Sequence, residues 1–412
     1  MNSRTPGTPD DAVDGVVPRW VVRPGNVAEV QACVRDAAAA NEAIVATGLG
    51  GHLDVGGRPT RLDVLLRLDL LSRVLDHQAA DMTVTVEAGC PLATLAQTLA
   101  AAGQWLPLDP PGDTTVGGFI AANLSGPLRA SQGTVRDLLI GIRTVAADGA
   151  LVSGGGKVVK NVAGYDLPKL HVGALGTVGV IVEATFKVRP RPEREEAVVI
   201  ACRNAEEAAD IAAGALDAAV PPLWLEVAGA GSLAEGPGDG AAAVIGLGGT
   251  ADEVAHGREI AMRASRRAIA VADGAGLRAR LSAFPVEPAA AVLRAATLPA
   301  DVGAVLAGAE RAARDVGAAV RTVAHAANGV VRVAVADERS VPALVRALRP
   351  AREAAGGSLV VERARPAVKD ALAAAGLDVW GDPGPGYELM RRLKAAFDPA
   401  RLLSPGRFVR GL

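Results

Sequence analysis

The stretch that decides the fold is residues 112–180, which read GDTTVGGFIAANLSGPLRASQGTVRDLLIGIRTVAADGALVSGGGKVVKNVAGYDLPKLHVGALGTVGV. Glycine recurs at short intervals, beside small residues and with few large side chains. Such material cannot build an ordinary core, because glycine has no side chain to bury and loses the most backbone entropy on folding. Glycines this dense indicate that the backbone approaches something closely. Since N–H groups in turns can hold phosphate oxygens, an extended cofactor with a phosphate-containing tail is the natural candidate.

The length and composition limit the class of protein. With 412 residues and 50% hydrophobic residues, the chain is expected to form two domains. Aromatic residues make up only 3%, so closely packed alanine-rich helices are expected in place of an aromatic core. The 43 basic and 45 acidic residues nearly balance, which argues against a general nucleic-acid-binding surface.

The cysteines and the N-terminus bear on compartment. Cys33, Cys90 and Cys202 are scattered, without the spacing of a metal site or a disulfide framework, so no metal is expected and a reducing cytoplasm fits. The polar start MNSRTPGTPDD lacks the apolar segment of a signal peptide. No apolar run reaches the roughly 18 residues that a membrane span needs.

Local patterns predict the elements of the first half. Asn26, with Glu29 three residues later, predicts a capped helix running to about Ala40. Residues 44–46 predict a short strand, and the alternation over 83–88 predicts a strand with one buried face. Further signals are a helix from Pro91 with an apolar stripe at Leu92, Leu95 and Leu99, a hairpin at Asp148-Gly149, a strand over 178–188 and a linker at 189–193.

The composition changes after about residue 195. Alanine-rich helices alternate with short strands, which predicts an α+β unit with an antiparallel sheet; the expected strands are 197–201, 223–228, 243–247 and 330–336. Asn328-Gly329 predicts a hairpin inside it. The last helix is expected to bury Leu389, Leu393 and Phe397, to expose Arg391, Arg392 and Lys394, and to end at Asp398-Pro399 before the chain returns to the first domain.

Two familiar phosphate motifs do not fit. The segment GALGTVG (173–179) precedes an apolar strand, whereas the dinucleotide fingerprint opens a helix after a strand. The segment GGGK (154–157) lacks the spacing and the Ser/Thr of a P-loop. The expected cofactor groove is therefore of another kind.

The chain resembles the vanillyl-alcohol oxidase and para-cresol methylhydroxylase (PCMH) family of FAD-binding proteins over residues 15–192 and 397–408. Within that family it is similar to the FAD-binding E subunits of bacterial glycolate oxidases. The segments that carry the resemblance are GGHLDVGGRP, MTVTVEAGCPLATLAQTLAAAGQWLPLDPP, TVGGFIAANLSGP, GTVRDLLIGIRTVAADG, GGKVVKNVAGYDLPKL, GALGTVGVIVEATFKV and FDPARLLSPGRF. The resemblance implies an α+β fold, in which FAD lies between two subdomains of a PCMH-type domain and its ring faces an α+β cap over the substrate pocket.

The resemblance implies a set of FAD-binding residues. Backbone N–H groups of the first loop would meet the pyrophosphate, namely Thr47, Gly48, Leu49, Gly50 and Gly51. The pyrophosphate and ribityl chain would pass Thr115, Gly117 and Gly118, the ring or ribityl would lie near Asn123, Ser125 and Gly126, and the flavin near Asn161, Gly164 and Tyr165. The adenine side would contact Gly176, Gly179 and Val180. The alternative for any one of these glycines is that it simply makes a turn.

His52 departs from the pattern of the resembled subunits, which commonly read Gly-Gly-Thr-Lys in this loop. Some branches of the family carry a histidine here that bonds covalently to the flavin. His52 aligns better with the lysine than with that histidine, so non-covalent FAD is expected, with His52 at the surface or on the phosphate side.

His325 and Asn328 are the candidate catalytic residues, because related cap strands face the flavin ring. The alternative for Asn328 is that the hairpin needs it. Oxidation of a 2-hydroxy acid requires a group that accepts the hydroxyl proton, and the sequence does not identify it. The histidine-rich metal-binding segment of catalytic hydroxy-acid dehydrogenases in this superfamily is not visible, which favours a subunit that is not the principal catalytic one.

The sequence therefore predicts a flexible tail (1–14), an FAD-binding domain (15–192), a cap (193–375) and a returning segment (376–412). The function expected from the resemblance is that of an FAD-dependent oxidoreductase acting on CH–OH groups, as the FAD-binding subunit of a glycolate oxidase complex. Its expected partners are a catalytic flavin subunit and an iron–sulfur subunit, because three dispersed cysteines cannot hold a cluster. The expected location is the cytoplasm, with membrane contact only through partners. The alternatives are a stand-alone oxidase or dehydrogenase and a non-catalytic FAD-binding scaffold.

Overall fold

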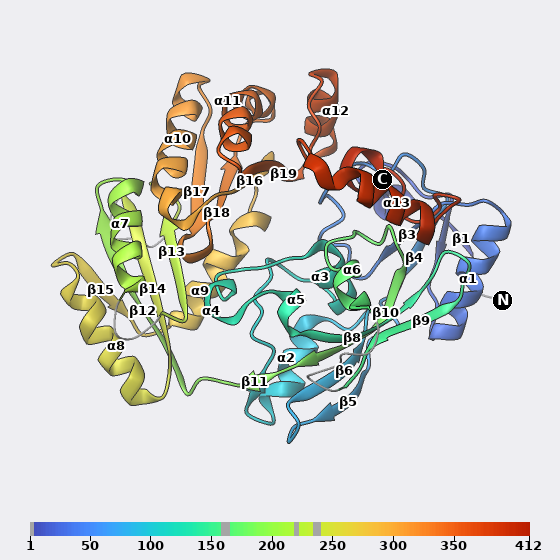
Figure 1. The fold of residues 1–412 in the computed structure, drawn as a ribbon, viewed down its shortest axis with the longest axis horizontal. Coiled ribbons are helices and arrows are strands. Elements are labelled where there is room, and N and C mark those ends of the chain that lie inside the picture. Colours follow the sequence, from blue (N-terminus) through green and yellow to red (C-terminus); the bar gives the residue numbers. More distant parts are fainter. Residues whose placement is uncertain (1–3, 158–164, 218–221, 234–239) are drawn as a thin grey trace.

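The computed structural model describes residues 4–157, 165–217, 222–233 and 240–412. Figure 1 shows two lobes joined by an extended connection, with the glycine-rich turns of the first half of the chain in one lobe and a large sheet in the other. The predicted FAD-binding residues Asn161 and Gly164 lie outside the described residues. None of the helices in the described ranges is long and apolar enough to cross a membrane.

The first lobe begins with a small, largely parallel sheet. Its order is β1 (Thr5–Pro6), β2 (Trp20–Val22), β4 (Val64–Arg67) and β3 (Ile44–Thr47). Helix α1 (Val27–Ala39) connects β2 to β3 and packs its apolar face on the sheet. As predicted, Asn26 caps this helix, because its side-chain oxygen accepts the backbone N–H of Glu29 at 3.0 Å.

An antiparallel sheet completes this lobe. Its order is β5 (Val74–Gln78), β6 (Thr83–Glu87), β10 (Val180–Lys187), β8 (Leu139–Val145) and β9 (Leu151–Gly155). Helices pack on it or connect to it, namely α2 (Leu92–Ala100), α3 (Val116–Ala122), α4 (Arg129–Gln132), α5 (Val135–Leu138) and α6 (Leu167–His171). The predicted Asp148-Gly149 hairpin joins β8 to β9. The predicted linker contains a short strand, β11 (Arg189–Pro190), which pairs with β7 (Gln104–Trp105).

The prediction of one buried face for residues 83–88 was wrong. Four of the five residues of β6 are buried, including Thr83 and Glu87. The second face is covered by polar contacts: Glu87 binds Arg73, and the hydroxyl of Thr85 lies 3.0 Å from that of Thr185. A polar residue in an alternating pattern therefore did not mark a face open to water.

The second lobe is built on an eight-stranded sheet in which every pairing is antiparallel. Its strand order is β15 (Ala268–Val271), β12 (Arg194–Cys202), β14 (Ala241–Gly249), β13 (Trp224–Ala228), β17 (Val320–His325), β18 (Val330–Val335), β16 (Ala291–Ala296) and β19 (Ser358–Ala364). The sheet carries the four strands predicted for the second half. The predicted hairpin joins β17 to β18 through the short helix η4 (Ala326–Asn328) and Gly329, whose φ is 66°.

The two faces of this sheet differ. One face packs on helices that Figure 1 places on the outside of the molecule, namely α7 (Ala205–Leu216), α8 (Ala251–Arg263), α10 (Val302–Asp315) and α11 (Val341–Ala354). The other face packs on helix α9 (Gly274–Ala283) and on Leu128 of the first lobe. The face turned to the first lobe therefore belongs to a cap. The short helices are η1 (Pro9–Asp11), η2 (Phe284–Val286), η3 (Pro299–Asp301), η5 (Glu338–Ser340), η6 (Gly384–Gly386) and η7 (Val409–Gly411).

The C-terminal segment returns to the first sheet. After α12 (Pro366–Ala374) and α13 (Tyr387–Phe397), the backbone of Leu402 accepts a hydrogen bond from Ile44, and Ser404 donates one back to Ile44. Two details of the last helix were predicted wrongly. Leu389 is 58% exposed, whereas Lys394 is buried and donates to Asp398 and to the carbonyl groups of Thr177 and Leu403. Lys394 thus ties the end of the helix to the chain beneath it.

A buried ion pair fastens the cap to the first lobe. Lys369 on α12 donates to the Asp14 carboxylate and, at 2.8 and 2.7 Å, to the carbonyl oxygens of Asp54 and Gly56. Lys369 is 5% exposed and Asp14 is 7% exposed. Desolvation raises the pKa of Asp14 and lowers the pKa of Lys369, so burial opposes both charges and the contacts between them offset that cost.

Replacing Lys369 by alanine is expected to lower the free energy of unfolding by about 3–5 kcal/mol, because it leaves the Asp14 carboxylate buried without its cation. Asp370→Ala is the matched control on the same helix. It breaks only the ion pair with Arg58, in which Asp370 is 65% exposed, so a loss below about 1 kcal/mol is expected. Urea unfolding measures both; equal losses would contradict the role of Lys369.

Candidate functional site

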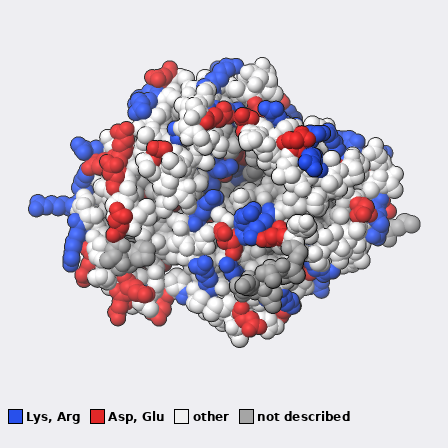
Figure 2. Space-filling view, viewed as in Figure 1, with Lys and Arg blue, Asp and Glu red and all other residues white. Residues whose placement is uncertain are grey.

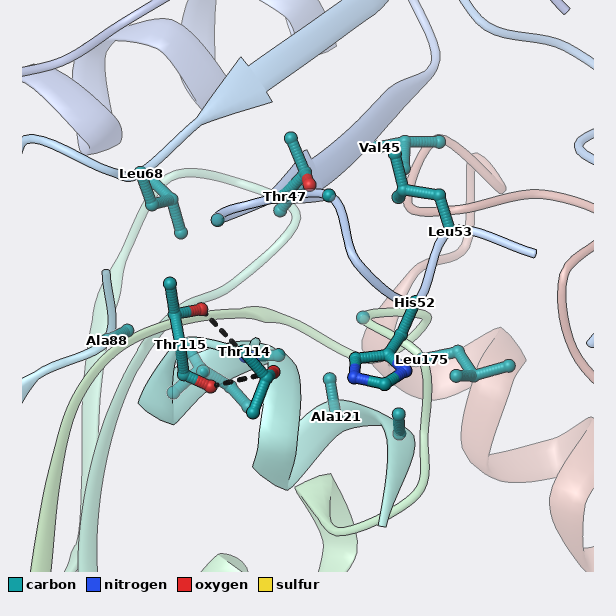
Figure 3. A pocket seen from close by; sticks show the side chains of 18 of the residues that line it. Val45, Thr47, His52, Leu53, Leu68, Ala88, Thr114, Thr115, Ala121 and Leu175 are labelled. Carbon is teal, nitrogen blue, oxygen red and sulfur yellow. Dashed lines mark hydrogen bonds between the residues drawn. The ribbon is translucent and has the colours of Figure 1, made fainter. Parts of the chain in front are cut away.

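Two loops and the start of a helix enclose a groove in the first lobe. The groove lies between the loop after β3, the N-terminal part of α3 and the turn before β10 (Figure 3). Its described lining is Val45–Leu53, Leu68, Ala88, Thr114, Thr115, Gly117, Gly118, Ala121, Ala122, Leu175, Gly176, Gly179–Ile181 and Arg407. Fourteen of these 23 residues are Gly, Ala or Thr, so much of the wall is backbone.

Close crossings of the chain explain three of the glycines. A Cβ atom at Gly48 would lie 2.2 Å from the Thr115 hydroxyl oxygen, and one at Gly51 would lie 2.5 Å from the Asp113 carbonyl oxygen. A Cβ atom at Gly117 would lie 3.0 Å from the Cβ atom of Ala88. These glycines let the walls of the groove approach each other. The resemblance instead implies that they contact the cofactor directly.

Other glycines keep the groove open. Gly50 has a φ of +80°, and its nearest neighbour for a Cβ atom is Leu53 at 3.7 Å. Gly118 lies in α3, where a Cβ atom would meet only the hydroxyl groups of Thr114 and Thr115, at 3.1 and 3.4 Å. The N–H groups at the start of this helix are engaged within the chain: Val116 donates to the Cys90 carbonyl at 2.9 Å, Gly117 to the Ala88 carbonyl at 2.7 Å and Gly118 to the Thr115 hydroxyl at 3.3 Å.

The structure brings together twelve of the predicted cofactor-binding residues. They are Thr47, Gly48, Leu49, Gly50, Gly51, His52, Thr115, Gly117, Gly118, Gly176, Gly179 and Val180. Arg407 was missed; it is buried, donates to the carbonyl groups of Leu53 and Val55 at 2.6 and 2.9 Å, and thereby holds the loop from behind. Only contact across more than 350 residues of chain reveals this role.

The remaining predicted residues lie elsewhere. Asn123 ends α3 in the left-handed conformation with φ 50°, a position that suits asparagine. Gly126 passes Asp109 so closely that a Cβ atom would lie 2.1 Å from its carbonyl oxygen. Ser125 is buried between the groove and the cap. Tyr165 is 93% exposed, so the structure does not bring it to the groove.

His52 points into the groove and not to the surface. Figure 3 shows its ring directed towards Ala121 and Leu175. Both ring nitrogens are shielded from solvent and have no hydrogen-bond partner in the described part of the chain. Desolvation, and then the charge of Arg363, lower the pKa of His52 to about 4, so the ring is neutral at pH 7. Two buried nitrogens without partners are a place where a polar ligand is expected.

Beside the groove, the cap sheet presents a cluster of arginines. The arginine cluster comprises Arg294 on β16, Arg332 on β18 and Arg129 of the first lobe, around Glu362 on β19. Arg332 Nε lies 2.8 Å and Arg294 Nε 3.3 Å from the Glu362 carboxylate. Arg129 donates to the Ser125 hydroxyl at 3.4 Å, and Arg332 donates to the Ser125 carbonyl at 3.3 Å. Figure 2 shows basic side chains around a hollow between the lobes.

Arg294 and Arg332 share the ionised carboxylate of Glu362, whereas the guanidinium group of Arg129 donates to Ser125. Arg294 and Arg332 are direct cross-strand partners, an arrangement that repels unless an anion lies between them. Desolvation lowers the pKa of Arg129, and the charges of Arg294 and Arg332 lower it further. For Glu362, desolvation would raise the pKa, but Arg332 and Arg294 outweigh it and the pKa falls below its usual value. The cluster therefore carries an excess of positive charge that suits a further anion.

Strand β19 connects the arginine cluster to the groove. The register of β16 and β19 shifts beside Val292, which leaves Glu362 as the extra residue of a bulge. The next residue, Arg363, donates to Asp54 at 2.8 Å and to the Gly51 carbonyl at 3.1 Å. A cavity of about 600 Å³ opens on the other side of this loop, between it and the cap. Glu362 and Arg363 are adjacent in β19. Glu362 belongs to the arginine cluster, whereas Arg363 binds the loop that lines the groove, so the two sites are neighbours.

The predicted catalytic residues do not line the groove. His325 is 2% exposed, and its ring nitrogens lie 2.7 Å from Glu226 and 2.6 Å from Arg332. The amide nitrogen and oxygen of Asn328 are shielded from solvent and have no hydrogen-bond partner among the described residues.

Sequence reasoning missed the arginine cluster, although it had a signal. Arg294, Arg332 and Glu226 are each the single charged residue of an otherwise apolar strand. A charge in such a position is costly unless it is paired or meets a ligand.

The comparisons with known proteins agree with this geometry. The family model described as "FAD binding domain" matches residues 18–155, and that of "FAD linked oxidases, C-terminal domain" matches residues 382–408. Residues 18–155, which form most of the first lobe, are thus similar to an FAD-binding domain. A solved structure of alkyldihydroxyacetonephosphate synthase matches the whole fold with a TM-score of 0.69 and 19% identity, covering 94% of this chain and 76% of that one. The predicted α+β fold with a cap is thereby confirmed.

Three curated relatives match parts of the chain. Glycolate oxidase subunit GlcE of Escherichia coli is 42% identical over 122 residues, and subunit GlcD of Bacillus subtilis is 31% identical over 212 residues. D-2-hydroxyglutarate dehydrogenase of Xanthomonas citri is 34% identical over 186 residues. These matches cover 29%, 51% and 45% of this chain and 35%, 45% and 39% of the relatives. The chain thus spans less than half the length of the curated relatives it matches.

The groove fits FAD, the cofactor of this family. Its backbone walls leave the space that a Cβ atom at Gly50 would reduce, and the ring nitrogens of His52 have no hydrogen-bond partner among the described residues. The loop 47–51 is the segment that would hold its phosphates, with Thr115, Gly117 and Gly118 lining the groove beside it.

Proposed function

We propose that this chain is the FAD-binding subunit of a glycolate oxidase-type complex that oxidises a 2-hydroxy acid. The observation that carries this proposal is the arginine cluster, in which Arg294 and Arg332 share the carboxylate of Glu362 and Arg129 binds the nearby Ser125, beside the proposed FAD groove. A cation-rich chamber next to a flavin suits a small substrate that bears a carboxylate. The curated relatives are named for glycolate, D-lactate and D-2-hydroxyglutarate, which all have this chemistry.

The residues of the chain would divide the work as follows. Bound FAD accepts the hydride that leaves the substrate carbon, while the hydroxyl proton leaves and a 2-oxo acid forms. Arg332 is engaged with three partners, namely Glu362, His325 and Ser125. Arg294 binds Glu362 and Arg129 binds Ser125, and their remaining N–H groups can donate to the substrate carboxylate. Asn328 is proposed to contact the substrate through its unpartnered amide.

The proposed partners are a catalytic flavin subunit and an iron–sulfur subunit. The similarity to GlcE and GlcD supports this context. Cys33, Cys90 and Cys202 are buried and dispersed along the chain, so an electron pair leaving the flavin needs clusters or acceptors held by other subunits. The proposed location is the cytoplasm, with contact to the inner face of the membrane only through these partners.

A stand-alone FAD-dependent oxidase or dehydrogenase is the second candidate, because the chain carries both the proposed FAD groove and the arginine cluster beside it. A non-catalytic scaffold is the third candidate. It is favoured by the absence of a free titratable base at His325, whose ring nitrogens are both engaged.

An anaerobic reduction experiment tests the proposed function. The chain is purified alone and co-expressed with candidate partners, and the flavin absorbance is followed after addition of glycolate, D-lactate or a neutral diol. We expect bleaching by the 2-hydroxy acids in the complex and none by the diol. Bleaching of the isolated chain would favour the stand-alone enzyme, and no bleaching in any preparation would favour the scaffold.

We also propose that FAD is held without a covalent bond, since backbone contacts on several sides of the groove can retain it. Acid precipitation of the purified protein is expected to leave a yellow supernatant. A yellow pellet that becomes colourless in His52→Ala would instead show a covalent bond to His52.

A further inference from the structure

His325 lies between a carboxyl group and a guanidinium group inside the cap sheet. It is the cross-strand partner of Glu226 on β13, and Arg332 reaches it from the neighbouring strand β18. The three side chains are almost fully buried: Glu226 is 0%, His325 2% and Arg332 6% exposed. Such a buried polar chain is retained only if its hydrogen bonds are made consistently.

The partners determine which ring nitrogen carries the proton. A guanidinium group can only donate hydrogen bonds, so Nε2 of His325, 2.6 Å from Arg332 Nη1, must accept. The ring proton therefore lies on Nδ1, which donates to Glu226 Oε1 at 2.7 Å. His325 is then neutral, and Nε2 cannot receive a proton from a substrate unless Arg332 first leaves.

The charges around the ring favour the same state. Desolvation lowers the pKa of His325 well below its usual value, and Arg332 and Arg129 lower it further. On the other side, desolvation and the charge of Asp109 raise the pKa of Glu226, which favours its neutral form. The remaining carboxylate nearby, Glu362, is paired with Arg332 and Arg294.

Arg332 also reaches the first lobe. While Nη1 is fixed by His325, Nε and Nη2 bind Glu362 at 2.8 and 3.3 Å, and Nη2 also reaches the Ser125 carbonyl at 3.3 Å. Arg332 therefore connects the cap sheet to the turn that also carries Arg129, four residues beyond Ser125.

We propose that Glu226 and His325 form a positioning relay that orients Arg332, and that Arg332 sets the spacing between the cap and the Ser125 turn so that Arg294 and Arg129 face one anion. His325 is thus a positioning residue and not the proton acceptor of the reaction. The consequence for substrate binding rests on the proposed function, whereas the orientation of the relay does not.

The orientation is tested without any turnover. ¹⁵N-histidine NMR of the FAD-loaded protein, with the His325 signals assigned by their loss in His325→Gln, reports the protonation of each ring nitrogen between pH 5 and 8. We expect a proton on Nδ1, none on Nε2, and no titration in this range. A proton on Nε2, or titration near neutral pH, would overturn the relay.

Kinetics then separates positioning from proton transfer. His325→Gln offers Arg332 a carbonyl acceptor and Glu226 an N–H donor, so kcat and the shape of its pH profile are expected to stay close to wild type. His325→Ala removes both contacts and is expected to raise KM for the 2-hydroxy acid by about tenfold, with a smaller effect on kcat. Loss of a general base would instead lower kcat by about 100-fold or more in both variants, which would contradict the proposal.

The NMR and kinetic experiments distinguish a failure of the proposed function from a failure of the relay. If no 2-hydroxy acid reduces the protein, the proposed function fails, and the NMR result still decides the relay. If the substrate is oxidised but His325→Gln loses its kcat, the proposed function stands and the relay is wrong.

Discussion

Gly118→Val is expected to weaken FAD binding by about tenfold to 100-fold. Gly118 lies in helix α3 with an ordinary backbone conformation, and its Cα atom faces the groove. A Cβ atom there lies 3.1 and 3.4 Å from the hydroxyl oxygens of Thr114 and Thr115, so valine crowds these side chains and narrows the groove in which we propose that FAD binds. Inserting methyl groups into a close-packed site costs about 1–3 kcal/mol, and about 1.4 kcal/mol corresponds to a factor of ten in affinity.

Gly214→Val is the matched control for this variant. Gly214 is also a helical glycine, in α7 of the cap, and nothing lies within 4 Å of a Cβ atom built on it. The same substitution there is expected to leave FAD affinity unchanged. Fluorescence titration of both apoproteins with FAD, with circular dichroism as the check of folding, measures the difference. Equal affinities in a folded Gly118→Val protein and the control would show that the groove is not the FAD site.

Arg294→Gln is expected to lower kcat/KM for a 2-hydroxy acid by about tenfold to 100-fold, mainly through KM. A hydrogen bond to a charged partner is worth about 1.5–3 kcal/mol, which corresponds to this range. Arg294 is the suitable member of the cluster to replace because its side chain is 31% exposed and because Glu362 keeps its contact with Arg332 in the variant. The affinity for FAD is expected to remain unchanged, since Arg294 does not line the groove.

Two comparisons make this result specific. Arg258→Gln removes an arginine from a pair with Glu196 in another part of the cap, and it is expected to leave kcat/KM unchanged. A neutral alcohol substrate, which has no carboxylate, is expected to be insensitive to Arg294→Gln. If Arg294→Gln and Arg258→Gln behave alike with a 2-hydroxy acid, the arginine cluster does not bind the substrate.

The sequence predicted the features that depend on local chemistry. The Asn26 cap, the Asp148-Gly149 and Asn328-Gly329 hairpins and the antiparallel sheet of the second half all appear in the structure. For the cap and the two hairpins, the required backbone geometry or hydrogen bond is made within a few residues, so the pattern and its cause lie together in the chain. Twelve of the predicted cofactor-binding residues also line one groove, because the resemblance covers these turns as a set.

The features that depend on distant parts of the chain were not predictable from local patterns. Lys394 was expected in water, but the returning segment buries it against Thr177 and Leu403. The role of Gly126 follows from its crossing with Asp109, and not from a cofactor. His325 was singled out as a catalytic histidine, yet its partner Arg332 engages the nitrogen that a base would use, and only the pairing of strands β17 and β18 reveals this contact.

The central claim is that the backbone-walled groove between the turns 47–51, 115–118 and 176–181 holds FAD. The most direct measurement is a titration of flavin-free protein with FAD, followed by flavin fluorescence and by the visible spectrum of the desalted product. The account predicts saturable uptake of one FAD per chain and a yellow protein. A folded protein that stays colourless and shows no saturable uptake would contradict it.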